Sequence, residues 1–158
     1  MHAPRLDQAL AGAHRVFPDT STCIAYHSSV ESVHPLARHL FGRIADPEDP
    51  LTGYLSVLAA TELLIRPIRA GGADLTFMHT FLRAFPHLNV VPVDLDVALQ
   101  AANIRALARL PIPDAIAVAS ALLSGCKAVV SNNRDWQGRL RARFPQFRWV
   151  YLAELIAP

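Results

Sequence analysis

Short apolar runs alternate with helical patterns along this chain, and the alternation constrains the fold more than any other feature. The runs predict a first strand from Arg15 that ends at Asp19, strands over 54–58, 89–93 and 127–131, and a last one from Arg148. Strands that alternate with helices indicate a parallel sheet covered by helices on both faces. At 158 residues, the chain is the size of one such domain.

Helical patterns fill the segments between the predicted strands, except for residues 45–53, which have the Pro, Asp and Gly content of a loop. The helices are expected to begin near Cys23, to span 35–43, to carry Glu62, to span 75–85, to follow Asp94 and to span 113–123. The apolar face of the helix that Asp94 caps is predicted to include Leu95, Leu99, Ala102 and Ala106.

The composition excludes a disordered chain, because 52% of the residues are hydrophobic and only 18% are charged. The uninterrupted apolar runs are nevertheless far too short to span a bilayer, and the first residues contain no apolar signal-peptide segment. We therefore expect a cytoplasmic protein with no membrane partner. Cys23 and Cys126 are expected to be buried thiols rather than a disulfide.

Three carboxylates each stand alone in an apolar stretch. Asp19 lies in VFPDTSTCIAY, Glu62 in YLSVLAATELLI and Asp114 in PDAIAVASALL, and each is the only charged residue there. Burying a carboxylate costs several kcal/mol unless another group compensates its charge. Three such costs suggest one shared compensator, and a divalent cation such as Mg²⁺ or Mn²⁺ suits oxygen ligands.

The predicted sheet places these acids together. Asp19 ends the first strand, Glu62 lies just beyond the second, Asp114 begins the helix before the fourth, and Asp135 follows the fourth. In an open parallel sheet, ligands bind at the carboxyl ends of the strands where the strand order reverses. We therefore expect all four acids to meet at one edge.

Each acid also has a simpler structural explanation. Asp19 and Asp114 could cap the helices that follow them, since a carboxylate accepts from free N–H groups at a helix start. Glu62 could pair with Arg66 one turn later, although such a pair contributes only a few tenths of a kcal/mol. That pairing would not justify burying the carboxylate.

Positive charge is concentrated near the C-terminus, although the net charge is only +2. Between residues 134 and 148 a single acid, Asp135, accompanies five arginines, namely Arg134, Arg139, Arg141, Arg143 and Arg148. A solvated surface and a phosphate-binding patch explain this cluster equally well.

Four segments in order, VFPDTSTCIAY, AATELL, PDAIAVASALL and VVSNNRDW, resemble the PIN-domain nucleases, including the VapC-type toxins of toxin–antitoxin pairs. The resemblance covers residue 15 to the end. It implies a three-layer α/β/α sandwich with a central parallel sheet of four to five strands. It also implies a Mg²⁺- or Mn²⁺-dependent endoribonuclease whose products carry 5′-phosphate and 3′-hydroxyl ends. Asp19, Glu62 and Asp114 match the family's acidic positions and are expected to bind metal or position water.

The fourth acidic position departs from the family pattern. Many relatives carry Asp where Asn133 stands, with a second acid two residues later, whereas here only Asp135 is acidic. Either Asp135 supplies the fourth catalytic and metal-binding carboxylate, which we favour, or Asn133 contributes a neutral oxygen. Ser21 and Ser131 are predicted to support the acids by hydrogen bonds, although ordinary polar residues at strand ends explain them as well.

The leading hypothesis is a ribonuclease of a VapBC-type pair, with Arg134, Arg139, Arg141 and Arg143 holding the RNA backbone. Its expected partners are RNA, a cognate antitoxin and a second copy of the chain. One alternative is a catalytically weak PIN-like protein that binds RNA or a partner. Another is a phosphotransferase with Asp19 as nucleophile, although DTST lacks the second Asp of the DxDxT motif. Residues 1–14 are expected to form an N-terminal extension, either packed as a helix or disordered, and residues 15–158 a single nuclease domain.

Overall fold

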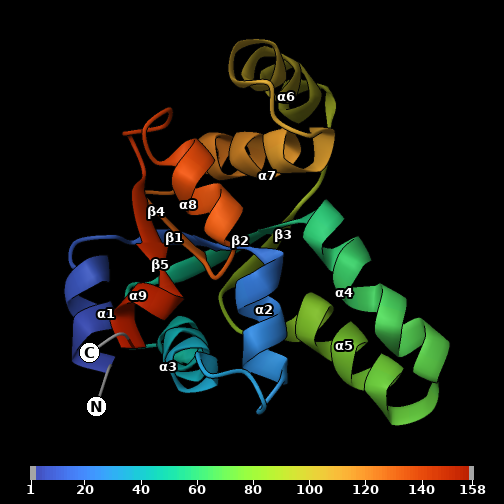
Figure 1. Ribbon diagram of the computed structural model, residues 1–158. Helices are drawn as coiled ribbons and strands as arrows, with labels where there is room; N and C mark the ends of the chain where they lie inside the picture. Colours follow the sequence, from blue (N-terminus) through green and yellow to red (C-terminus); the bar gives the residue numbers. More distant parts are fainter. Residues whose placement is uncertain (1–2, 157–158) are drawn as a thin grey trace.

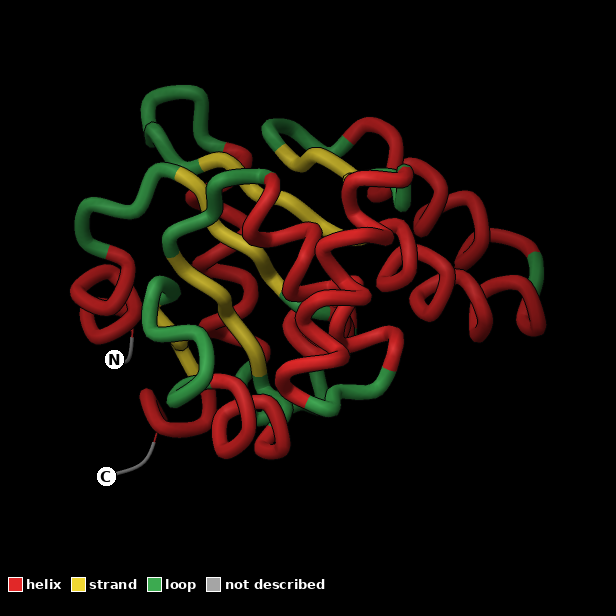
Figure 2. The backbone as a smooth tube through the Cα atoms, turned by 90° about the horizontal axis from the view of Figure 1, so that it is seen from above, coloured by secondary structure: helices red, strands yellow, loops and turns green. Residues whose placement is uncertain are grey.

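The computed structural model describes residues 3–156, except for the side chain of Gln137. The first two residues of the predicted extension 1–14 and the last two of the predicted domain 15–158 lie outside the described residues. The described residues form a five-stranded parallel sheet between layers of helices (Figures 1 and 2). This confirms the predicted α/β/α sandwich. The strand order is β3-β2-β1-β4-β5, with β1 at Arg15–Pro18, β2 at Thr52–Ser56, β3 at Leu88–Val91, β4 at Ala128–Ser131 and β5 at Arg148–Tyr151.

Alternating side chains of the central strands supply two separate cores. In β1, Val16 belongs to one buried cluster and Phe17 to the other; in β4, Val130 and Val129 divide in the same way. Successive side chains of a strand point to opposite faces of the sheet. The continuous apolar runs of the sequence therefore reflect strands that are buried on both sides.

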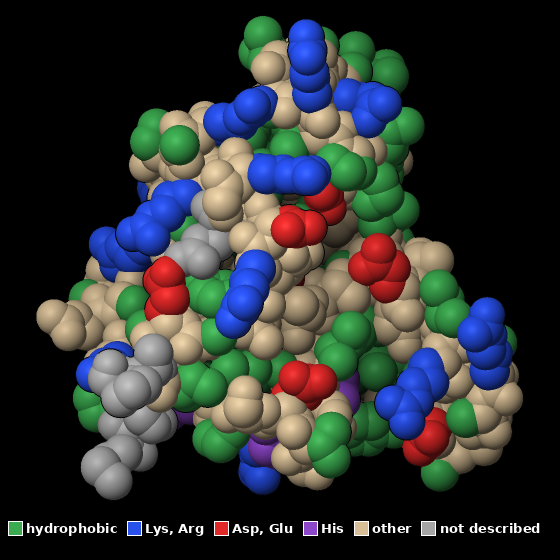
Figure 3. Space-filling view, viewed as in Figure 1, with side chains coloured by type: hydrophobic (Ala, Val, Ile, Leu, Met, Phe, Trp, Pro, Cys, Tyr) green, Lys and Arg blue, Asp and Glu red, His purple; other side chains and the backbone are tan. Residues whose placement is uncertain are grey.

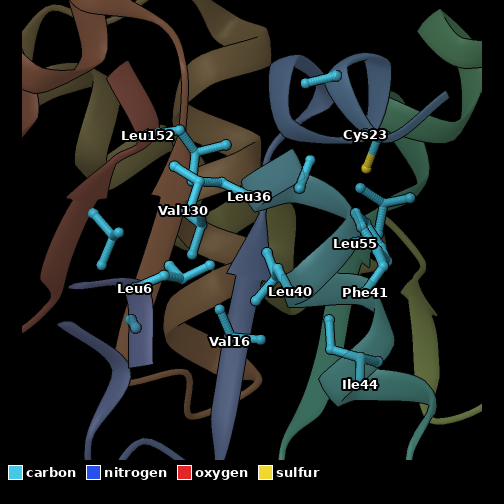
Figure 4. Close-up of a cluster of buried hydrophobic side chains, with 14 of the residues drawn as sticks. Leu6, Val16, Cys23, Leu36, Leu40, Phe41, Ile44, Leu55, Val130 and Leu152 are labelled. Atoms are coloured by element: carbon cyan, nitrogen blue, oxygen red, sulfur yellow. The ribbon is translucent and has the colours of Figure 1, made fainter. Parts of the chain in front are cut away.

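The larger core lies under the helices near the two chain termini (Figures 1 and 4). Leu6, Leu36, Leu40, Phe41 and Leu152 fill it together with Val16 and Val130 of the sheet. The helices that contribute buried residues to it are α1 (Ala3–Leu10), α2 (Thr20–His27), α3 (His34–Ala45), α4 (Val57–Ala70), α5 (Gly72–Ala84) and α9 (Leu152–Ile156).

The second core lies on the opposite face, beneath the helices drawn at the top of Figure 1. Its buried residues come mainly from α6 (Leu95–Ala108), α7 (Ile112–Leu123) and α8 (Arg134–Leu140). The helices α4 and α5 pack against each other and extend to one side of the molecule (Figure 1).

The strand order creates a switch point between β1 and β4. The chain runs from β1 outward through β2 and β3 on one side, then returns to place β4 and β5 on the other. Loops that leave β1 and β4 therefore diverge to opposite sides of the sheet and open a crevice at the carboxyl ends of these strands. Asp19 directly follows β1, and Ser131 is the last residue of β4.

Several predicted boundaries were displaced by the local chemistry of the helix starts. The second helix begins at Thr20 rather than near Cys23, because Asp19 caps it. The second strand covers residues 52–56 rather than 54–58, since Ser56 caps α4 and ends the strand. The third strand stops at Val91 rather than at residue 93, and Pro92 has no N–H for the ladder.

Gly53 lies inside the second strand, which begins earlier than predicted. A Cβ at this position would lie 2.8 Å from Cδ1 of Leu88 and 3.1 Å from Cδ1 of Ile44. Gly53 pairs with Val16 and with Leu88, so the glycine allows α3 to approach the sheet closely at this point. A glycine that reads as part of a loop in the sequence is thus inside the strand.

The predicted apolar face of α6 was wrong. Leu95 and Leu99 are 73% and 58% exposed, and Ala102 and Ala106 are also exposed. The buried side chains are those of Val97, Ala101, Ile104 and Ala108. Both sets have helical spacing, because apolar residues surround this helix on nearly all sides, so periodicity could not choose between them. Asp94 does cap α6, accepting a hydrogen bond from the Val97 N–H at 2.9 Å.

Two expectations about the chain as a whole can be compared with the fold. Cys23 and Cys126 are both free and buried, as predicted. Within the described residues, no helix is long and apolar enough to cross a membrane.

The helix α1 is part of the main core, which gives a test of the segment before residue 15. Leu6 is fully buried, whereas Leu107 on α6 is 86% exposed. We expect Leu6→Ala to lower the free energy of unfolding by about 3 kcal/mol, and Leu107→Ala to change it by less than about 0.5 kcal/mol. Urea denaturation measures both. Equal stability of the two variants would show that α1 adds nothing to the core.

Candidate functional site

Asp19 lies at the switch point of the sheet, between β1 and α2. Its backbone N–H donates to the Val130 carbonyl at 3.0 Å, which joins the end of β1 to β4. Its side chain is only 5% exposed. The fold therefore holds a carboxylate almost completely inside the protein at the edge where parallel sheets bind ligands.

Both oxygens of Asp19 accept hydrogen bonds. Oδ1 accepts from the Ser21 hydroxyl at 2.7 Å and from the Thr22 N–H at 2.9 Å, and the Thr22 hydroxyl lies 3.0 Å away. Oδ2 accepts from the Ser131 hydroxyl at 2.6 Å. Because the donors come from α2 and from the end of β4, the carboxylate has a fixed orientation.

The two serines also order the turn that follows β4. The Asn132 N–H donates to the Ser21 hydroxyl at 2.8 Å, and the Asn133 N–H donates to the Ser131 hydroxyl at 2.9 Å. Each serine thus connects one backbone N–H of this turn to one oxygen of Asp19. Such chains of hydrogen bonds strengthen one another in a buried environment.

Burial raises the pKa of Asp19, and the hydrogen bonds from Ser131, Ser21 and Thr22 lower it only in part. The net pKa remains above its usual value because burial outweighs the effect of these neutral donors. None of the ion pairs between described residues includes Asp19. The carboxylate therefore lacks a counter-charge among the described side chains.

Glu62 extends from α4 toward the same region. Its Oε2 accepts a hydrogen bond from the Thr20 hydroxyl at 2.6 Å. The alternative pairing with Arg66 does not occur among the ion pairs of the described residues. The expected burial cost of Glu62 was wrong, because this side chain is exposed, unlike that of Asp19.

Asp114 occupies the first turn of α7 and is half-buried. Its Oδ1 accepts a hydrogen bond from the indole N–H of Trp136 at 3.1 Å. Burial raises its pKa, which Trp136 and Arg139 partly offset, while the charges of Glu62 and Asp135 raise it further. Asp114 does not cap α7, because the N-cap residue is Pro111 and forms no side-chain cap hydrogen bond.

Three of the four predicted acids line one cleft of about 250 Å³, namely Asp19, Glu62 and Asp114. The apolar side chains of Phe17, Ile24, Leu58, Ala59, Pro113, Ala117 and Trp136 complete much of its wall. Acidic side chains lie around the hollow in the middle of the face that Figure 3 presents. The cleft thus combines negative groups with an apolar wall.

Asn133, rather than Asp135, lines the cleft at the fourth position. The Asn133 side chain caps α8 and accepts from the Asp135 N–H at 3.0 Å. Asp135 is exposed on the first turn of α8, where its charge still raises the pKa of Asp114. The helix cap is the structural reason for the placement, since it directs the Asn133 side chain to the helix start.

The arginines of the C-terminal cluster have different surroundings. Arg143 donates to the Ala108 carbonyl, and Arg148 donates to the carbonyls of Ala9 and Ala11. Arg134, Arg139 and Arg141 are exposed on or beside α8 and make no hydrogen bond or ion pair with a described group. These three are the members of the cluster whose guanidinium groups are available to a ligand.

Among the described residues, no three His, Cys, Asp or Glu side chains are placed so that they could hold a metal ion together. The three acids share a cleft, but each accepts hydrogen bonds from different side chains. Ser131 donates to Asp19, Thr20 to Glu62 and Trp136 to Asp114.

Sequence reasoning missed three polar contacts of the acids. Thr20 and Thr22 lie within three residues of Asp19, and their spacing would have been informative once Asp19 was placed at a helix start. Trp136 gave one signal in advance, because the N–H of a buried tryptophan requires an acceptor. Nothing in the sequence indicated that the acceptor would be Asp114.

The PIN domain family model matches residues 16–141, so the chain belongs to the PIN-domain family. This confirms the resemblance seen in the sequence. The match leaves the hypothesis of a phosphotransferase with an Asp nucleophile without support. A comparison with curated proteins finds no match.

Solved structures with a similar fold include toxin–antitoxin proteins. A toxin–antitoxin complex from Klebsiella pneumoniae has a TM-score of 0.62 and 19% identity, over 87% of this chain and 97% of that chain. The sarcin–ricin-loop-cleaving toxin VapC20 of Mycobacterium tuberculosis has a TM-score of 0.60 and 20% identity, over 78% and 93%. The DNA-bound VapBC of Salmonella typhimurium has a TM-score of 0.60 and 22% identity, over 87% and 98%.

The raised pKa of Asp19 predicts a pH-dependent loss of stability. The folded state binds this proton more tightly than the unfolded state, so the free energy of unfolding falls as pH rises from 3.8 through the raised pKa. Asp19→Asn removes this effect and leaves that of Asp114 unchanged. We expect the variant to gain stability relative to the wild type as pH rises from about 4 to about 8 in EDTA. Urea denaturation measures this difference, and a constant or shrinking difference contradicts the prediction.

Proposed function

We propose that this protein is a Mg²⁺- or Mn²⁺-dependent endoribonuclease and the toxin of a toxin–antitoxin pair in the cytoplasm. The observation that carries the proposal is the buried Asp19 carboxylate in a cleft that also contains Glu62 and Asp114, on a PIN-domain fold. The acids have no cationic partner in an ion pair among the described residues. A divalent cation would compensate the buried charges of Asp19 and Asp114 and the repulsion among the three acids.

The residues fit such an ion by their donor chemistry, since every candidate ligand is a carboxylate or amide oxygen. Asp19, Glu62 and Asp114 would hold the ion, with Asn133 or Asp135 as the fourth group. When bound, the ion supplies positive charge that acidifies water and neutralises the phosphate. Glu62 is the most exposed of these three acids, and its Oε2 accepts a hydrogen bond from the Thr20 hydroxyl.

The protein itself would orient the ligands and the RNA. Ser21 of α2 and Ser131 of β4 each donate to a different oxygen of Asp19. Arg134, Arg139 and Arg141 would bind backbone phosphates beside the cleft, because phosphate recognition relies on exposed cationic side chains. We assign Arg143 a weaker part in RNA binding, since its guanidinium already contacts the Ala108 carbonyl.

Cleavage of unstructured and structured RNA tests this function. We expect activity with Mg²⁺ or Mn²⁺ and none in EDTA. Partners of metal ligands typically contribute 10- to 100-fold, so replacing a ligand itself, by Asp19→Asn or Glu62→Gln, should reduce the rate by at least about 100-fold.

The matched control is Asp96→Asn, which removes an exposed acid from the first turn of α6, away from the cleft. This variant should cleave within about twofold of the wild type. Undiminished cleavage by Asp19→Asn would exclude the site assignment, and cleavage in EDTA would exclude the dependence on metal.

A groove between α2, α4 and α5 supports the proposal of an antitoxin partner. It has a volume of about 640 Å³ and shares Ile24 and Glu62 with the acidic cleft. Val30 and Phe77 in its wall are 90% and 59% exposed. We propose that the C-terminal segment of the antitoxin occupies this groove and reaches the acids with a basic side chain. A homodimer remains a prediction.

The partner proposal can be tested with the protein encoded by a small open reading frame beside the gene. Co-expression should yield a complex that no longer cleaves RNA. Phe77→Asp should abolish the complex while RNA cleavage persists, because it places a charge among the apolar side chains of the groove. Leu123→Asp, at an exposed position on α7, is the control and should preserve the complex. Absence of such a reading frame, or inhibition that survives Phe77→Asp, contradicts this part of the proposal.

Asn133 favours one alternative, a PIN-like protein that binds RNA or a partner without efficient catalysis. It places a neutral amide where a fourth carboxylate would strengthen metal binding. A thermal melt distinguishes the two functions, since a ligand that binds only the folded state stabilises it. A nuclease should gain thermal stability with Mn²⁺, and a protein that only binds RNA should not.

A further inference from the structure

Trp136 contacts an acid of the cleft although it belongs to the second core. It lies on α8, is 7% exposed, and lines the cleft beside Asp114. Its indole N–H donates to Oδ1 of Asp114 at 3.1 Å, across 22 residues of sequence. The described side chains provide no second hydrogen bond to this carboxylate.

The second tryptophan is an internal comparison. Trp149 is also partly buried, and its indole N–H donates to the Phe144 carbonyl at 2.9 Å, five residues away. The two rings pack edge to face, with centroids 6.4 Å apart. Both indole N–H groups therefore have a hydrogen-bond acceptor, but only that of Trp136 donates to a carboxylate. Hydrogen bonds to charged groups are stronger than those between neutral groups.

This contact limits how Asp114 can turn. Asp19 is fixed by several donors, and Glu62 is exposed and held by one hydroxyl. Asp114 is held by the rigid indole of a core residue. Its Oδ1 accepts the indole hydrogen bond, and its Oδ2 is left to bind a ligand. The core of the α8 layer thereby determines the orientation of an acid in the cleft.

We propose that Trp136 is a positioning residue that orients the Asp114 carboxylate for a divalent cation in the cleft. The inference rests on the proposed function, since it needs a cation at these acids. Groups that hydrogen-bond metal ligands typically contribute 10- to 100-fold to metal affinity or activity.

The first test compares Trp136→Phe with Trp149→Phe. Each substitution removes an indole N–H and keeps an aromatic ring, but only the first removes the donor to Asp114. Isothermal titration with Mn²⁺ should show about tenfold weaker binding for Trp136→Phe and wild-type affinity, within about twofold, for Trp149→Phe. The kcat for RNA cleavage should fall by a similar factor for Trp136→Phe, with KM for RNA nearly unchanged.

The second test uses the unaltered site and does not depend on the folding of Trp136→Phe. The chain has two tryptophans, so an NMR spectrum of the ¹⁵N-labelled protein contains two indole N–H signals, which Trp149→Phe assigns. Titration with Mg²⁺ should shift the Trp136 signal and leave the Trp149 signal nearly in place.

The outcomes separate this inference from the proposed function. If the wild type binds Mn²⁺ and cleaves RNA, and Trp136→Phe does both as well as Trp149→Phe, the positioning role is wrong and the nuclease function stands. A Trp136 signal that stays in place while Mg²⁺ binds has the same meaning. If the wild type neither binds Mn²⁺ nor cleaves RNA, the proposed function fails and the inference fails with it.

Discussion

The hydrogen bonds of Asp19 connect the centre of the sheet to the cleft, and the other features of the site depend on them. The Asp19 N–H bonds β4, its side chain starts α2, and its two oxygens order the turn after β4 through Ser21 and Ser131. The same turn begins α8, which carries Trp136 and the exposed Arg134 and Arg139. One buried carboxylate thus organises both sides of the switch point, at the cost of a raised pKa.

This arrangement explains why capping and function are not competing accounts of Asp19. As a cap, the carboxylate accepts the Thr22 N–H at the start of α2. An exposed aspartate would serve that purpose without a burial cost. The additional serine donors and the 5% exposure are what a cap does not require, and they favour a role in ligand binding.

The sequence predicted the parts of the structure that depend on strand order and helix capping. The alternation of strands and helices led to the parallel sheet, and the carboxyl-end rule brought Asp19, Glu62 and Asp114 to one edge. The sequence pattern predicted the wrong buried face of α6, because both faces of this helix are apolar and only the rest of the core determines which one is buried. It also could not anticipate the contact of Trp136 with Asp114, which depends on how α8 packs against α7.

The fourth acidic position of the site likewise could not be assigned from the sequence. Acidity alone favoured Asp135, but the cap of α8 places Asn133 at the cleft and leaves Asp135 exposed. The charge of Asp135 still acts on Asp114, so charge and direct contact are divided between neighbouring residues.

A crystal soaked in Mn²⁺ and measured at the manganese absorption edge tests the central claim most directly. Anomalous scattering locates the ion without assumptions about its ligands. The account predicts a manganese peak in the cleft, bound by Asp19 together with Glu62 or Asp114, and absent in crystals of Asp19→Asn. A crystal saturated with Mn²⁺ that has no peak near Asp19, or an equal peak in Asp19→Asn, would contradict it.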